Sequence, residues 1–85
     1  MKIYSLYDKK AMVYSPVMTF ANDVFAIRAI EAEMSNPKSS VATYPFDFCL
    51  MELGTFDDST GKIVSREIPI NVYECNSYFS KTEEK

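Results

Sequence analysis

The sequence predicts an α+β domain in which two β-hairpins form a four-stranded antiparallel sheet, with one helix packed on one face. Three observations predict this class. Two short runs of β-branched and aromatic residues flank a polar turn near the N-terminus, an alanine- and isoleucine-rich segment follows, and a second pair of such runs flanks a turn ending in Gly61. The chain has 85 residues, enough for one small domain. We expect the order ββαββ over residues 1–79 and a disordered acidic tail at 80–85.

The first hairpin is expected from residues 2–7 and 11–15, which are rich in the residue types that strands favour. Asp8-Lys9-Lys10 supplies the polar turn between them. Pro16 should end the second strand, because proline lacks the backbone N–H that a sheet ladder needs.

The helix is expected over residues 22–35. Asn22 can cap the first free N–H groups, and Asp23 suits the positive end of the helix dipole. Asn36-Pro37 should end the helix, because the residue before a proline avoids the α conformation.

The second hairpin follows a polar loop over residues 36–45. A largely buried strand is expected at 46–56, a turn at 57–61 and a returning strand at 62–65. Residues 68–75 can add a further short strand.

Apolar residues lie on two sides of the expected helix, which turns by about 100° per residue. One stripe should pack on the sheet, and it consists of Ile27, Ile30 and Met34 with Val24 at its edge. The second stripe lies nearly opposite and consists of Phe25, Ala29 and Ala32. A single sheet covers only one of the two.

Two covers for the second stripe remain open. A second copy of the chain could pack on it, giving a homodimer through Phe25, Ala29 and Ala32. Alternatively, residues 68–79 of the same chain could fold across it. A chain of this size buries only about 60–65 % of its unfolded surface, so self-association would add to its stability.

The composition excludes several classes of function. There is no histidine, which excludes a Ser-His-Asp triad, a Cys-His pair and a histidine-bearing metal site. Two glycines leave no room for a Walker loop or a dinucleotide-binding fingerprint. No apolar run approaches the roughly 20 residues that span a membrane. We expect a nonenzymatic protein without cofactor, metal or membrane contact.

The cysteines Cys49 and Cys75 are expected to be free thiols. We expect no secretory leader, because Met1-Lys2 leads straight into the first expected strand, and a reducing compartment keeps such thiols unpaired.

The net charge of −3 is unevenly distributed. Residues 1–45 carry five basic and four acidic residues, whereas residues 46–85 carry four basic and eight acidic ones. Any contact with nucleic acid should therefore come from the N-terminal hairpin and the helix.

One constellation combines basic and aromatic residues at the tip of the first hairpin. Lys9 and Lys10 lie between Tyr7 and Tyr14. Lysines can contact phosphates, and tyrosines can stack on unpaired bases. Three further basic residues could extend this site: Arg28, Lys62 and Arg66. The alternative is that the lysines occupy a solvated turn and the tyrosines belong to the core.

Four sequence blocks together match the pattern of one protein family. They are residues 1–11, 21–28, 44–48 and, most specifically, the run from Leu53 to Lys62. In order and spacing they resemble the small nonstructural protein of gokushovirus-type microviruses, which are single-stranded DNA phages. The resemblance implies a phage protein of the host cytoplasm that is not part of the capsid. Such proteins are likened to the microvirus protein that shifts replication from duplex copying to single-strand synthesis for packaging.

The expected function is therefore binding of single-stranded DNA during viral genome replication, with phage or host replication proteins as further partners. The alternative is a homo-oligomeric adaptor between proteins that makes no nucleic-acid contact.

Overall fold

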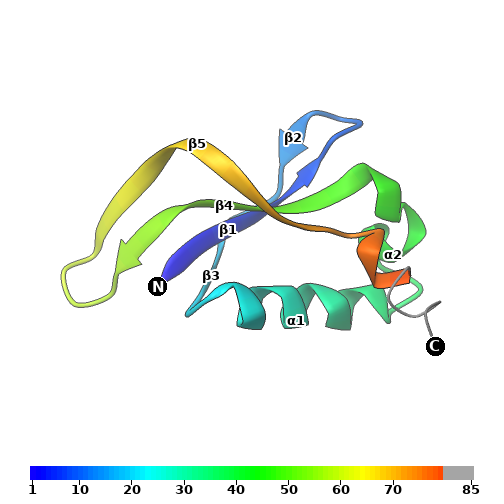
Figure 1. Ribbon diagram of the computed structural model, residues 1–85, viewed down its shortest axis with the longest axis horizontal. Coiled ribbons are helices and arrows are strands. Elements are labelled where there is room, and N and C mark those ends of the chain that lie inside the picture. Colours follow the sequence, from blue (N-terminus) through cyan, green and yellow to red (C-terminus); the bar gives the residue numbers. More distant parts are fainter. Residues whose placement is uncertain (80–85) are drawn as a thin grey trace.

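The computed structural model describes residues 1–79, and the tail expected at 80–85 lies outside the described residues. The sheet is antiparallel throughout and has the strand order β2 (Val13–Tyr14), β1 (Lys2–Asp8), β4 (Phe48–Asp57) and β5 (Lys62–Glu74) (Figure 1). A further strand, β3 (Met18–Phe20), also pairs with β1. One main helix, α1, lies along one side of this sheet. The expected α+β class is confirmed, and the sheet contains a fifth strand in addition to the four expected.

The N-terminal segment contains three strands, β1 (Lys2–Asp8), β2 (Val13–Tyr14) and β3 (Met18–Phe20). The second strand is shorter than the expected 11–15, because the turn extends to Met12, whose φ is 60°. The Asp8 carboxylate closes this turn by accepting the N–H groups of Lys10 and Ala11, each at 3.0 Å. β3 follows Pro16 and pairs with the first half of β1.

Helix α1 spans Asp23–Met34, close to the expected bounds. The Asn22 side chain accepts the Phe25 N–H at 3.1 Å, as expected for an N-cap. The segment expected as a loop after it contains a short helix, α2 (Ser40–Thr43). A 3₁₀ turn, η1 (Pro45–Asp47), follows, so the next strand starts at Phe48 and not at residue 46.

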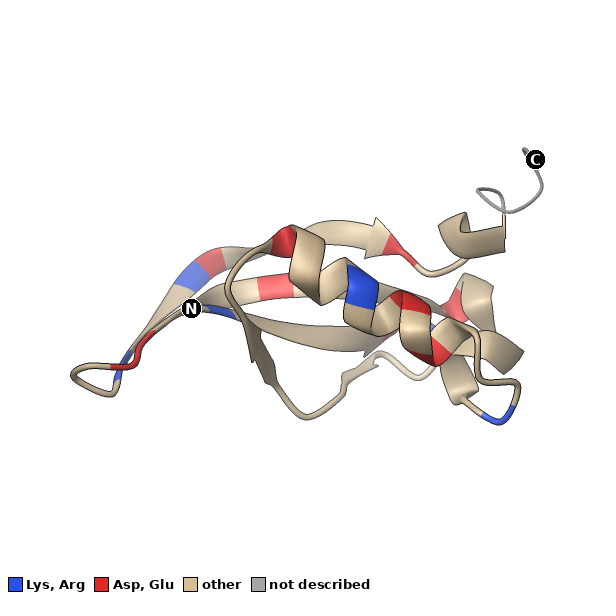
Figure 2. Ribbon diagram, turned by 90° about the horizontal axis from the view of Figure 1, so that it is seen from below, with Lys and Arg blue, Asp and Glu red and all other residues tan. Residues whose placement is uncertain are grey.

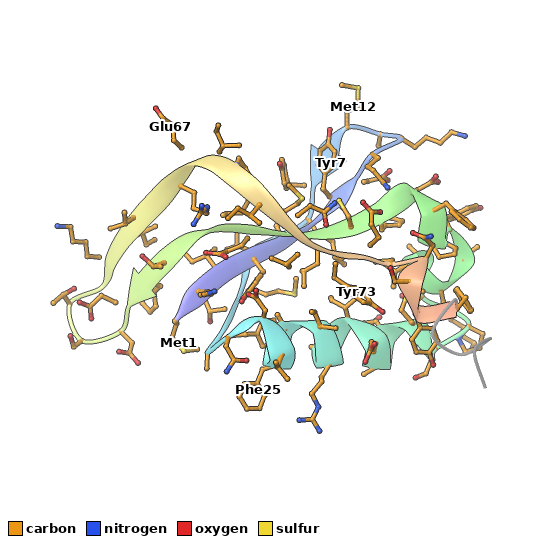
Figure 3. The ribbon with its side chains drawn as sticks, in the orientation of Figure 1. Met1, Tyr7, Met12, Phe25, Glu67 and Tyr73 are labelled. Carbon is orange, nitrogen blue, oxygen red and sulfur yellow. The ribbon has the colours of Figure 1, made fainter. Side chains whose placement is uncertain are left out.

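The second hairpin consists of β4 (Phe48–Asp57) and β5 (Lys62–Glu74). Its turn matches the expected one, and Gly61 provides a positive φ of 78°. The two strands expected after the turn form one continuous strand. Its register shifts in the middle, since Glu52 opposes Ile70 while Gly54 opposes Ser65. Residues 66–69 therefore bulge away from β4, with Glu67 near the apex of β5 (Figure 3).

The core lies between α1 and the sheet, and it consists of Tyr4, Ala26, Ile30, Met34, Val41, Leu50 and Cys75. Ile30 and Met34 are buried as expected, whereas Ile27 is only half-buried and Val24 is exposed. Ala26 is buried in addition, because the buried line of α1 follows an i, i+4, i+8 spacing. The small alanine lets the helix approach the sheet closely.

Residues 54–65, which we term the arm, form the far end of the β4–β5 hairpin. The arm extends beyond the N-terminal end of α1 (Figure 1). It begins at Gly54, where a Cβ atom would lie 2.2 Å from the carbonyl oxygen of Val64. The close approach of the two backbones therefore requires glycine at this position.

Candidate nucleic-acid interface at the N-terminal hairpin

Tyr7 and Tyr14 form a cross-strand pair on the first hairpin. They oppose each other in the β1–β2 register, and their ring centroids lie 4.6 Å apart with planes tilted by 44°. Tyr7 is half-buried and Tyr14 is exposed, and neither belongs to the core cluster. The alternative that both are core residues is therefore wrong. A tilted aromatic pair at the surface offers a ring face on which a flat group can stack.

Lys9 and Lys10 differ in their surroundings although they are neighbours. The Lys9 ammonium donates to the Glu74 carboxylate at 2.7 Å, and Asn71 donates to the same carboxylate at 2.7 Å. The hydrogen bond raises the pKa of Lys9 and lowers the pKa of Glu74. Lys10 is exposed, and its side chain makes no ion pair with another described residue. Lys10 is therefore the cation of this turn that is available to a ligand.

The three basic residues expected to extend this site lie on other parts of the molecule. Arg28 belongs to α1, Lys62 to the end of the arm, and Arg66 to the bulge of β5. β1 places the first hairpin beside Phe48, whereas Lys62 pairs with Asp57. The ten residues of β4 between these two ends correspond to about 30 Å. The structure therefore does not gather these three residues around the first hairpin, and their contact with a nucleic acid stays a prediction.

Figure 2 shows the same separation, because bands of Lys and Arg are spread along the whole length of the molecule and alternate with Asp and Glu. In this view the Lys and Arg positions of the described residues do not gather in one region of the backbone, whereas duplex-binding proteins typically cluster their basic residues.

A buried carboxylate, that of Glu52, binds two of the basic side chains, Lys2 and Arg66. Glu52 is only 6 % exposed, and it lies 3.6 Å from the Lys2 ammonium and 3.7 Å from the Arg66 guanidinium. Lys2 also lies 3.4 Å from Asp23, which accepts the Tyr4 hydroxyl at 2.5 Å. Burial and the bond to Asp23 raise the pKa of Tyr4. This network joins β1, α1, β4 and β5, so these charges support the fold.

Two adjoining pockets open near the first hairpin, and Lys10 lines the smaller one. The smaller, of about 470 Å³, is lined by Asp8, Lys10, Ala11, Ser40, Tyr44, Asp47 and Phe48. It shares Ser40 and Phe48 with a larger, mainly apolar pocket of about 630 Å³ between α1, α2 and β1. Volumes of this size suit small ligands or single ligand groups. Tyr44 is 60 % exposed and adds an aromatic ring beside Lys10.

Tyr44 was not predicted to belong to the site from the sequence. The only local signal was its position before Pro45, which is typical of a loop. Its place beside the hairpin results from the fold, since the Lys9 N–H donates to the Asp47 carbonyl at 2.7 Å.

The thiols of the two cysteines are not accessible at the surface. Cys49 and Cys75 are both buried and free, as expected. Burial raises the pKa of the Cys75 thiol to about 12 and also raises the pKa of Cys49. Burial and a raised pKa both disfavour a reactive thiolate at these two positions. No group of metal-ligating side chains is present among residues 1–79.

The second helix face remains uncovered within the described chain. Phe25 is 52 % exposed and points away from the sheet (Figure 3). Ala32 is exposed and Ala29 is half-buried. Residues 68–79 do not cover this face, because Tyr73 and Tyr78 pack against the core and the Tyr73 hydroxyl donates to Glu31 at 3.2 Å. The intrachain cover is therefore wrong, and the homodimer through this face remains a prediction.

These features define a small α+β domain with surface tyrosines, a cation at one hairpin tip, and apolar surfaces left uncovered within residues 1–79. The chain matches the model of the Phage ORF5 protein family over residues 1–78, and it belongs to this family of phage proteins. Neither a curated protein nor a solved structure matches it. Within the described residues, no helix has the length and apolar character needed to cross a membrane.

Proposed function

We propose that this phage protein binds single-stranded DNA without catalysing a reaction. The bound strand would lie at the N-terminal hairpin, and binding would assist or switch viral genome replication and packaging in the host cytoplasm. Phage or host replication proteins are the further partners of this proposal, in line with the resemblance to the gokushovirus nonstructural protein. The observation that supports it best is the Tyr7–Tyr14 pair at the surface, next to a lysine that no other described residue neutralises.

The chemistry of this end of the molecule favours single strands over duplexes. Unpaired bases expose their faces, and stacking on an aromatic side chain contributes about 1–3 kcal/mol per base. Tyr14 and Tyr44 are both exposed, and Lys10 lines the pocket that contains Tyr44. A duplex hides its base faces and would need several phosphate contacts, but Lys9 is already paired with Glu74. The expected binding is therefore modest in affinity and weakly salt-dependent.

Fluorescence anisotropy with a labelled single strand, and with the matching duplex, tests this proposal across a salt series. We expect binding of the single strand that weakens with salt, and much weaker binding of the duplex. Tyr14→Ala should weaken it by about 5- to 150-fold, the equivalent of one lost stacking contact. Lys10→Ala should weaken it less and reduce its salt dependence.

Lys62→Ala is the matched control, since it removes the same charge from the opposite end of β4. It should leave the affinity nearly unchanged. If the wild-type protein does not bind the single strand even at low salt, the proposal is wrong.

A second candidate function is favoured by the exposed helix face. An adaptor that self-associates through Phe25, Ala29 and Ala32 would cover the large apolar side chain that the described chain leaves exposed. Light scattering should then give the mass of a dimer for the wild type and of a monomer for Phe25→Glu. A monomeric wild type at high concentration would contradict self-association and leave the proposed DNA binding untouched.

A further inference from the structure

Two apolar surfaces are not packed against any other part of the described chain. One belongs to a helix and the other to a β-hairpin. One is the outer face of α1, where Val24 and Phe25 are exposed. The other is the arm, where Ile63 and Val64 are 62 % and 54 % exposed. Both lie towards the same end of the molecule, with the arm extending past the start of α1 (Figure 1).

The arm has apolar side chains on both of its faces. Ile63 opposes Phe56 and Val64 opposes Thr55, so successive residues of β5 point to opposite sides. A two-stranded hairpin without a packed face is at best marginally stable in water. The arm therefore gains stability if one of its faces packs on another apolar surface.

The charges beside the two surfaces are complementary. The arm ends in Asp57, Asp58 and Lys62, which are all exposed and have a net charge of −1, and Asp58 makes no ion pair with another described residue. The outer face of α1 carries Arg28 one turn after Phe25, and Arg28 makes no ion pair with another described residue. A contact between arm and helix would thus join an apolar centre to an ion pair at its edge.

We infer that the arm of one copy lies across the outer face of α1 in a second copy. Ile63, which shares a face of the arm with Phe56, packs on Phe25 there, and the acidic turn lies beside Arg28. Each copy offers one arm and one helix, so a two-fold arrangement makes the contact twice and closes after two copies. This inference rests on the self-association proposed above and names the surface that contacts the helix. A helix-to-helix contact would leave both arms uncovered.

Cross-linking of mixed variants distinguishes the two arrangements. One chain carries Ala29→Cys and another carries Ile63→Cys, while the native thiols are buried. Under mild oxidation, we expect a disulfide-linked dimer in the mixture and little in the Ala29→Cys chain alone. A helix-to-helix dimer predicts the reverse, because the thiols introduced at position 29 of the two copies would then lie near each other.

A charge exchange tests the ion pair. Arg28→Asp and Asp58→Lys should each weaken dimerisation about 2- to 5-fold, as expected for an exposed pair, and the double variant should restore it. Sedimentation measures all three. Lys38→Asp is the control for charge alone, since Lys38 lies beyond the opposite end of α1, and it should have no effect.

The apolar centre has its own matched pair. Ile63→Asp should give a monomer, whereas Ile68→Asp should remain a dimer, because Ile68 lies in the bulge outside the arm and is 74 % exposed. Both positions are at the surface, and circular dichroism should show an intact fold for both.

The outcomes separate the inference from the self-association on which it rests. A dimer whose Ala29→Cys chains cross-link with each other, and whose charge exchange gives no recovery, overturns the arm-to-helix contact and leaves self-association standing. A wild-type monomer overturns both.

Discussion

The same two strands, β4 and β5, are stabilised in different ways at their two ends. Near Leu50 and Tyr73 they lie over α1, and Leu50 is fully buried in the core. Beyond Gly54 they continue as the arm, where Ile63 and Val64 are exposed. Burial holds the first region, whereas backbone pairing and the 57–61 turn hold the second. The comparison shows that apolar side chains in a strand mark a core only where another element lies over them.

The largest expected effect tests the core end of this comparison. Leu50→Ala removes a fully buried side chain and should lower the free energy of unfolding by about 2–5 kcal/mol. Ile63→Ala makes a comparable truncation in the arm and should change it by less than about 0.5 kcal/mol in the monomer. Urea denaturation at low protein concentration measures both. Equal losses would show that the arm is packed within a single chain.

The next effect concerns the junction between the two regions. Gly54→Ala places a Cβ against the backbone of Val64, so the strands must separate, at a cost of about 1–3 kcal/mol. Gly61→Ala is the control, because a Cβ there meets open space and only the positive φ is strained. Its cost should be near 1 kcal/mol. Thermal unfolding compares them, and a smaller loss for Gly54→Ala would refute the close approach.

A smaller effect is expected from the network between β1 and α1. Tyr4→Phe removes the hydroxyl that donates to Asp23 and should cost about 1–1.5 kcal/mol. This value is at or below the lower end of the range for hydrogen bonds to charged groups, because the Asp23 carboxylate is partly exposed to solvent. Tyr14→Phe should cost almost nothing, since no hydrogen bond of its hydroxyl is found among the described residues. Chemical denaturation of both variants gives the difference, and similar values would contradict this role of Tyr4.

The smallest effect is the pH dependence of the Lys9–Glu74 pair. The pKa of Glu74 lies below the ordinary 4.5, so its stabilisation is present above that value and is lost as the pH falls through the lower, folded pKa. Both side chains are about two-fifths exposed, which limits the contribution to less than about 1 kcal/mol. Glu74→Gln should therefore be slightly less stable than the wild type near neutral pH and equally stable at strongly acidic pH. A difference that persists in acid would assign the effect to packing.

The parts of the fold that could be predicted are those fixed by local chemistry. Asn22 and Asn36-Pro37 set the ends of α1, and the run from Asp57 to Gly61 sets the second turn. β3 was missed because Pro16 precedes it and no turn motif in the sequence predicts that this segment pairs with β1. Ala26 was missed because its burial depends on where the helix approaches the sheet.

The candidate site was predictable to the same extent. A hairpin between residues 2 and 15 already brings Tyr7 and Tyr14 together. The pairing of Lys9 with Glu74 joins residues 65 positions apart, so it depends on the register of β5 across β4 and β1. The same register carries Lys62 and Arg66 away from the first hairpin. Basic residues that the sequence alone assigns to one site can thus lie at opposite ends of a long strand.

The bulge in β5 limits how this chain can assemble. β5 is the outermost strand of the sheet along the path from β2, and an outer strand of 13 residues offers a free row of backbone groups to any extended chain. Residues 66–69 leave the ladder, Pro69 has no N–H to donate, and Arg66 and Glu67 add charge at the same point. The free edge is thereby divided into two short pieces, each of which is a poorer template for a further strand than a continuous edge of 13 residues. The chain can present apolar side chains to a partner and still resist open-ended fibre growth.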